Sequence, residues 1–183
     1  MIFLAMIFAG KRVWSNLNNL KIENKVKEFQ WKCLHNIIYT ESRLKKMNKS
    51  NGQCHFCLDN DSEETLQHLF FQCEVSSIIV QKINNILQIL NISVNVNIGE
   101  REMMLGIVAL DNSVSLVNIL IFYTKWYLWK IRNTIKYNKL KLSRQAIVNI
   151  WRKDLTANLR FIHKLKINTT DDRLNLSVII DHL

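Results

Sequence analysis

CHFCLDNDSEETLQHLFFQC, residues 54–73, contains three of the four cysteines of the chain and one histidine, in the spacing C-x2-C-x10-H-x4-C. Thiolate sulfur and imidazole nitrogen are the donors that Zn²⁺ prefers, usually in a tetrahedral arrangement. The two residues between Cys54 and Cys57 allow one tight turn to present both sulfurs to the same ion. We therefore predict one zinc ion held by Cys54, Cys57, His68 and Cys73.

The spacing of the second ligand pair constrains the backbone. Positions five apart on an α-helix differ in direction by about 500°, or about 140° net, because each turn holds 3.6 residues. His68 and Cys73 cannot face one ion from an unbroken α-helix, so the helix must end or distort between them. Four protein ligands leave no open position for water, which predicts a structural site rather than a catalytic one.

Other interpretations of the CHFC stretch fit less well. A c-type haem site requires a histidine directly after the second cysteine, where this chain has Leu58. A thioredoxin-like redox pair requires a βαβ pattern, and the sequence shows none. The remaining alternative is that the cysteines have this spacing by chance and bind no metal. His55 lies in the turn from Cys54 to Cys57, called the knuckle below, and is expected to be exposed. Cys33 is expected to lie in the core.

The composition favours helices. The chain of 183 residues has no proline and four glycines, so few residues interrupt helices. We predict a mostly α fold, in which a small helical zinc-binding module precedes a helical C-terminal lobe. Thr40, Ser62 and Ser143 are the expected N-caps of three helices. Helical periodicity is seen at 26–37, 41–48, 64–72, from 75 onward, at 113–139 and at 143–164.

The expected domain organisation has five parts. They are an N-terminal apolar segment cut from a larger fold (1–24), a helical Cys-Cys-His-Cys (CCHC) zinc-binding module (25–92), a linker (93–100), the C-terminal lobe (101–168) and a tail (169–183). The apolar run at the N-terminus has about ten residues, too few to span a bilayer, and its positive charges follow it. We expect an intracellular protein, in the cytoplasm or nucleus, without a membrane partner or a small-molecule substrate.

Positive charge is concentrated in two segments. The net charge is +10, and residues 1–50 hold ten basic and three acidic residues, while residues 125–166 hold twelve and one. Such asymmetry favours a polyanionic partner, with a purely solubilising surface as the alternative. We predict two candidate nucleic-acid contacts. The first is a patch just before Cys54, formed by Arg43, Lys45, Lys46 and Lys49. The second is a basic stripe on one face of a helix, with an indole among the cations, formed by Lys125, Trp129, Arg132, Lys136 and Lys139. A solvated face with Trp129 turned into the core is the alternative for the stripe.

Three stretches together resemble a known family: FQWKCLHNIIYTESRLKKMN (29–48), CHFC (54–57) and EETLQHLFFQC (63–73). They are similar to the zinc-binding domain at the C-terminal end of reverse-transcriptase polyproteins from non-LTR (LINE-type) retrotransposons. The positions that carry the resemblance are Phe29, Trp31, Lys32, Leu34, His35, Thr40, Cys54, Cys57, Glu63, Glu64, Thr65, His68, Leu69, Phe70 and Cys73.

The resemblance implies binding of the element's RNA or of its DNA target, and a reverse-transcriptase domain as a possible partner. The chain lacks a Tyr-x-Asp-Asp polymerase motif, so we expect no polymerase or endonuclease activity of its own. Two alternatives remain. The module could only buttress a reverse transcriptase, or the chain could be a degenerate retrotransposon fragment without function.

Overall fold

The structure is a computed structural model that describes residues 13–15, 17–57, 62–89, 97–108, 115–164 and 170–183. The predicted N-terminal apolar run and the first half of the predicted linker lie outside these residues. The described part is mostly helical, with one isolated antiparallel β-bridge between Gln53 and Glu63. The predicted fold class is confirmed. No helix in the described part is long and apolar enough to cross a bilayer.

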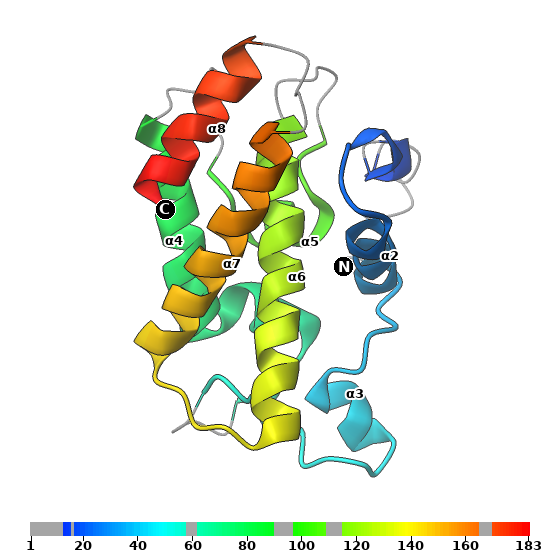
Figure 1. The fold of residues 1–183 in the computed structure, drawn as a ribbon. Coiled ribbons are helices and arrows are strands. Elements are labelled where there is room, and N and C mark those ends of the chain that lie inside the picture. Colours follow the sequence, from blue (N-terminus) through cyan, green and yellow to red (C-terminus); the bar gives the residue numbers. More distant parts are fainter. Residues whose placement is uncertain (1–12, 16, 58–61, 90–96, 109–114, 165–169) are drawn as a thin grey trace.

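The helices divide into a long group and a short group (Figure 1). α6 and α7 run side by side, with α4 and α8 packed on α7 and α2 on α6. Of the short elements, α5 contacts η1 and α2, and α3 directly precedes the turn that carries Cys54 and Cys57. The bounds are α2 (Asn24–Leu34), α3 (Glu41–Lys46), the π-helix η1 (His68–Gln72), α4 (Glu74–Ile89), α5 (Glu100–Leu105), α6 (Ser115–Asn138), α7 (Arg144–Lys164) and α8 (Thr170–His182).

α6 is the central helix. Its first half is apolar on nearly every side, and residues 116–125 are all buried, so it can be surrounded by neighbours. The ring of Phe29 in α2 meets that of Trp126 in α6 edge-on at 5.3 Å and that of Phe70 in η1 at 6.2 Å. The helices of the predicted zinc module and of the predicted C-terminal lobe therefore share one apolar core. The domain boundaries themselves stay a prediction.

Two of the predicted caps are present. The hydroxyl of Thr40 accepts a hydrogen bond from the amide of Arg43, and that of Ser143 accepts one from Ala146. The segment predicted only as a weakly patterned tail forms α8, which packs on α7 and buries Leu176 and Ile179. Tertiary packing stabilises this helix where its own periodicity is weak.

Lys125 does not belong to a surface stripe, so this part of the sequence prediction is wrong. Its side chain is fully buried, its Nζ donates to the carbonyl of Met104 at 3.1 Å, and it lies 5.4 Å from the ring centroid of Phe70. Burial lowers the pKa of Lys125 and raises the pKa of the neighbouring Cys33 thiol to about 11. The ammonium group therefore costs stability in its charged form.

We expect Lys125→Met to raise the free energy of unfolding at pH 7, by up to about 4 kcal/mol, because it removes a buried charge at similar volume. The Met104 carbonyl keeps a hydrogen bond from Gln30 at 3.1 Å. The pKa of Lys125 is lower in the folded protein than the value of 10.5 in the unfolded chain. The destabilisation that the buried ammonium causes in wild type therefore decreases as the pH rises from the folded pKa to 10.5. The advantage of the variant should shrink over the same range.

Urea unfolding at several pH values measures this difference. Lys130→Met, on the exposed side of the same helix, is the control and should show no such pH-dependent advantage. An advantage of Lys125→Met that does not change with pH, or a loss of stability at pH 7, would contradict the interpretation.

Candidate metal centre

A short antiparallel ribbon presents the first two cysteines. The amide of Cys54 donates to the carbonyl of Ser62 at 3.0 Å, and that of Glu64 donates to the carbonyl of Gly52 at 2.9 Å. Gly52 has a φ of +88°, and a Cβ there would lie 2.6 Å from Cδ of Lys45. A glycine is needed at this turn because both its dihedral angle and the close approach of Lys45 exclude a side chain.

The second ligand pair follows a helix start that differs from the predicted one. Ser62 is not the cap, and Glu63 and Glu64 precede the helix, since Glu63 takes part in the β-bridge. The hydroxyl of Thr65 accepts from the amide of His68 at 3.0 Å and so caps the first turn. Pairing with the knuckle ribbon keeps 62–64 extended, which overrides the sequence signal for an earlier helix start.

The predicted distortion between His68 and Cys73 is a π-helix. The five residues of η1 are wound with i→i+5 hydrogen bonds, and the amide of Cys73 donates to the carbonyl of His68 at 2.7 Å. Cys73 itself is extended, with φ −60° and ψ 138°, before α4 begins at Glu74. A π-turn brings residues five apart much closer in direction than an α-helix does, so both side chains can reach one ion.

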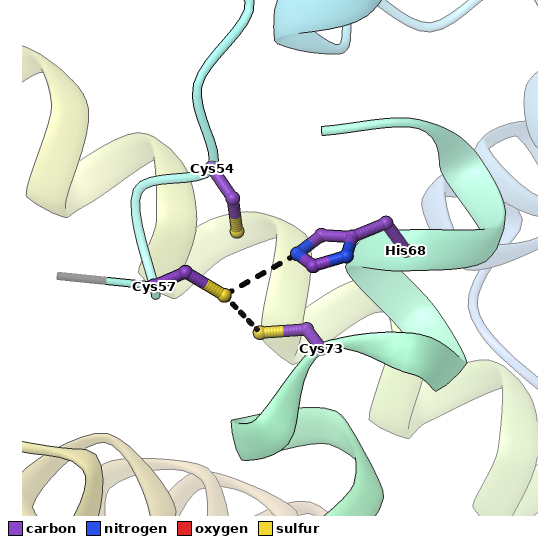
Figure 2. Close-up of side chains that lie close together, drawn as sticks. All are labelled: Cys54, Cys57, His68 and Cys73. Carbon is purple, nitrogen blue, oxygen red and sulfur yellow. Dashed lines mark hydrogen bonds between the residues drawn. The ribbon is translucent and has the colours of Figure 1, made fainter. Parts of the chain in front are cut away.

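The four predicted ligands converge on one point (Figure 2). Their donor atoms all lie within 4.8 Å of one another. Cys57 Sγ is 3.4 Å from His68 Nε2 and 3.5 Å from Cys73 Sγ. Zinc bonds of about 2.3 Å to sulfur and about 2.0 Å to nitrogen place tetrahedral donors roughly 3.5–3.8 Å apart. The residues present fit one zinc ion, bound through three sulfurs and Nε2 of His68.

Without a bound cation, the surroundings of Cys54 and Cys57 favour the neutral thiols over the thiolates. The hydrogen bond with Cys73 and burial raise the pKa of Cys54, and burial and the nearby Cys54 raise that of Cys57. A divalent cation reverses this balance because it stabilises each thiolate directly. The amide of Phe56 points at Cys54 Sγ from 3.4 Å, and that of Glu74 is directed at Cys57. Both amides offset the negative charge of the sulfurs.

The remaining cysteine and the neighbouring histidine lie outside the cluster, as predicted. Cys33 is buried in the apolar core. His55 is partly exposed, and its Nε2 lies 3.0 Å from Glu41 Oε1 instead of facing the sulfurs. The ligand set is therefore three cysteines and His68, with no further cysteine or histidine among the described residues at the centre.

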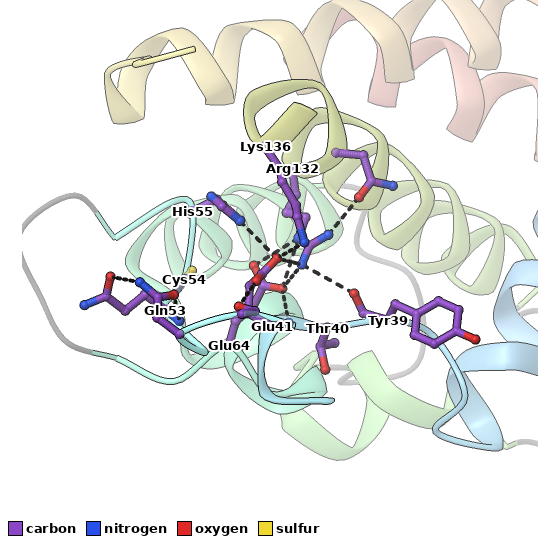
Figure 3. Close-up of polar contacts among 12 residues, drawn as sticks. Tyr39, Thr40, Glu41, Gln53, Cys54, His55, Glu64, Arg132 and Lys136 are labelled. Carbon is purple, nitrogen blue, oxygen red and sulfur yellow. Dashed lines mark hydrogen bonds and ion pairs between the residues drawn. The ribbon is translucent and has the colours of Figure 1, made fainter. Parts of the chain in front are cut away.

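A buried ion-pair network lies beside the knuckle and joins it to α6 (Figure 3). The side chains of Arg132, Glu41 and Glu64 are 1%, 3% and 0% exposed. Arg132 Nη2 lies 2.6 Å from Glu64 Oε1 and 2.5 Å from Glu41 Oε1, and its Nε lies 3.0 Å from Glu64 Oε1. One guanidinium thus holds together α3, the knuckle ribbon and α6.

Lys136 completes the neutralisation of Glu41. Its Nζ lies 2.6 Å from Glu41 Oε1, and Ser50 donates to the other carboxylate oxygen. Burial alone would raise the pKa of Glu41, but the hydrogen bonds from Lys136 and Ser50 and the charge of Arg132 outweigh it and lower the pKa to about 2. Glu41 therefore stays ionised in the folded protein at neutral pH.

These contacts correct the predicted basic stripe on α6. Arg132 is buried and serves the network, so its assignment as a nucleic-acid contact is wrong. Trp129 is half-buried, lies 6.0 Å from the ring of Phe29 and is covered by the Arg132 guanidinium at 4.8 Å. Lys136 is 20% exposed and engaged with Glu41, and Lys139 is exposed.

Sequence reasoning missed the network. It treated Glu63 and Glu64 alike, as first-turn carboxylates of a helix, although Glu64 is fully buried on Arg132. A partial signal was present, because a cation that becomes buried on an apolar helix needs a polar or charged partner. The identity of that partner depends on the tertiary contact.

We expect wild-type protein to contain one zinc per chain, and Cys57→Ser and His68→Ala to lose it and unfold the region of residues 50–75. Zinc binding contributes about 10–16 kcal/mol in small fingers, which exceeds the margin of most domains. Elemental analysis and limited proteolysis report the two effects. Cys33→Ala, the matched control at the fourth cysteine, should keep its zinc. A folded wild type without zinc would overturn the site.

We expect Arg132→Met to lower the free energy of unfolding by about 3–5 kcal/mol, because it leaves two buried carboxylates without their guanidinium. Adding Glu64→Gln should recover part of that loss. Arg144→Met removes the exposed pair with Glu74, at 2.7 Å, and should cost under about 1 kcal/mol. Chemical denaturation compares the variants, and equal losses for Arg132→Met and Arg144→Met would refute a structural role for the network.

Comparison with known proteins supports the same assignment. Residues 5–79 match a family model described as zinc-binding in reverse transcriptase. No curated protein and no solved structure shows significant similarity to the chain. The matched segment includes all four ligands and the residues on which the sequence resemblance rests. Residues 5–79 of this chain are therefore similar to the zinc-binding domains of reverse transcriptase.

Proposed function

We propose that this chain is a zinc-stabilised nucleic-acid-binding module from a non-LTR retrotransposon reverse transcriptase, which binds RNA, target DNA or both. The observation that carries the proposal is a group of exposed lysines beside the metal centre. Lys45, Lys46 and Lys49 are exposed in and just after α3, and no carboxylate of the described residues pairs with them. Such cations are available to phosphates.

Packing and hydrogen-bond contacts connect the segment that carries these lysines to the segment that carries Cys54. The aliphatic stem of Lys45 packs against Gly52, the turn that leads into Cys54. Ser50, between Lys49 and that turn, donates to Glu41 at the start of α3. Loss of zinc would release the ribbon on which the lysines rest. The proposed role of the metal is thus to fix the position of a cationic surface, not to take part in chemistry.

The end of α6 extends the same surface. The ion pair between Lys136 and Glu41 holds the last turns of α6 against the first residue of α3. Lys139 and Lys141 follow directly and are exposed. The parts of the two predicted patches that remain at the surface therefore belong to neighbouring elements. Lysine contacts of this kind give affinity with little sequence readout.

A structural role is the second candidate. The burial of Lys125 and Arg132 turns two of the five residues of the predicted stripe into internal support, as expected for a module that buttresses a polymerase domain. Such a module would bind nucleic acid weakly even at low salt. A degenerate fragment without function would do the same, and it would also fail to bind zinc if its site had decayed.

We propose no enzymatic activity for this chain by itself. Four protein ligands close the zinc coordination sphere, so the ion has no position for an activated water. The proposed partners are a nucleic-acid backbone and a reverse-transcriptase domain, and the proposed setting is intracellular, where reduced thiols are available to bind the metal.

We expect the triple variant Lys45→Gln, Lys46→Gln and Lys49→Gln to bind RNA and DNA more weakly than wild type. The slope of log K against log salt should fall by roughly 2, because about 0.7 to 0.9 counterions are released per phosphate contact. Fluorescence anisotropy over a salt series measures both quantities. The matched control replaces Arg152, Lys153 and Arg160, exposed on α7, by glutamine. Equal effects of the two triple variants would leave net charge, not this surface, as the cause.

A further inference from the structure

Exposed aromatic rings gather at the end of α2, beside the lysines of α3. Trp31 is 43% exposed and Tyr39 is 56% exposed. The exposed imidazole of His35 lies 4.3 Å from the ring of Trp31, tilted by 37°, and 5.2 Å from that of Trp14, tilted by 32°. The rings are thus in tilted contact, and Trp31 and His35 remain exposed to solvent.

Backbone contacts fix this arrangement. The Nδ1 of His35 donates to the carbonyl of Trp31 at 2.9 Å. The chain then turns at Asn36, which has a φ of 53°. Trp31 and His35 are one helical turn apart and are held in register by this hydrogen bond, so the stack is preorganised rather than a chance contact of two mobile side chains.

Arg43 connects the stack to Tyr39 and to α3. Its Nη1 donates to the carbonyl of Asn36, and its guanidinium carbon lies 5.8 Å from the ring centroid of Tyr39. Figure 3 shows the Tyr39 ring directed away from the buried ion-pair network, while its carbonyl accepts from Arg132 at 3.4 Å. Along the chain, the exposed rings of Trp31, His35 and Tyr39 are thus followed at once by Arg43 and the exposed lysines of α3.

This combination of rings and cations selects the class of partner. Isolated exposed hydrophobic residues are normal and need no explanation, but here two large rings share a surface with unpaired cations. Trp, Tyr and Arg are common at protein interfaces, but lysine is depleted there, so the three lysines of this surface favour a nucleic acid as the occupant. Unpaired nucleic acid presents phosphates for the cations and open base faces for the rings. A duplex offers the phosphates but keeps its bases stacked inside.

We propose that Trp31, His35 and Tyr39 form a stacking platform for the bases of a single-stranded nucleic acid, whose phosphates are bound by Arg43 and the lysines of α3. The inference rests on the proposed nucleic-acid-binding function and specifies its substrate as an unpaired strand. The base-stacking term is independent of salt, so it can be separated from the lysine contacts.

The test uses the full zinc-loaded chain and three labelled probes: an unstructured 20-nucleotide RNA, the same sequence as DNA, and that DNA as a duplex. Trp31→Ala and Tyr39→Ala are compared with Phe161→Ala, which removes an aromatic ring that is 57% exposed on α7. Zinc content and circular dichroism establish that each variant is folded. Trp31→Phe retains a ring and is the conservative variant.

Each platform variant should lose roughly 5- to 100-fold in affinity for the single strands, and much less for the duplex, since one stacked base contributes on the order of that factor. The salt slope should not change, Phe161→Ala should bind like wild type, and Trp31→Phe should keep most of the affinity. Comparing the affinities for the RNA probe and for the single-stranded DNA probe shows which single strand is preferred.

Two results would overturn the inference in distinguishable ways. Salt-dependent binding by wild type, with Trp31→Ala and Tyr39→Ala equal to it or equally weakened on the duplex, would reject the platform and leave the proposed function intact. No binding of any probe by zinc-loaded wild type at low salt would reject the proposed function and the platform with it.

Discussion

Two ligands five residues apart on one helical segment must reach the same ion, and the rest of the zinc domain is arranged around this constraint. An α-helix separates His68 and Cys73 in direction, and the π-helix brings them back to one side. Because the turn ends in an extended Cys73, α4 starts in a new direction immediately afterwards. The geometry at the metal therefore sets where α4, and with it the packing of α7, begins.

The second organising element is the guanidinium of Arg132. It neutralises two carboxylates in a place that water does not reach, and these carboxylates come from α3 and from the ribbon that carries the cysteines. A charge removed from water is tolerated only where its partners are in place. The network thus gives α6 a role in supporting the zinc domain, although α6 lies outside the segment that matches the family.

The electrostatic character of the molecule follows from how its cations are distributed between interior and surface. Both Lys125 and Arg132 are drawn into the core, by a carbonyl and by carboxylates respectively. Lys45, Lys46 and Lys49 stay at the surface, where none of the described acidic residues forms an ion pair with them. The cationic surface is consequently smaller than the net charge of +10 suggests, and it lies beside the metal centre.

The sequence by itself determined the four ligands, the need for a break between His68 and Cys73, the helical class and the caps at Thr40 and Ser143, because these depend on spacing, donor chemistry and local backbone preference. The sequence did not determine where the helix carrying His68 begins, since the ribbon pairing that keeps Glu63 extended is formed with Gln53. Nor did it determine which cations face water. Helical periodicity places Lys125 and Arg132 on one stripe with Lys136, but only the packing of α2, α5 and the knuckle against α6 decides that this stripe points inward. Burial is a property of the assembled fold, and a charged side chain is buried only where another element supplies its partner.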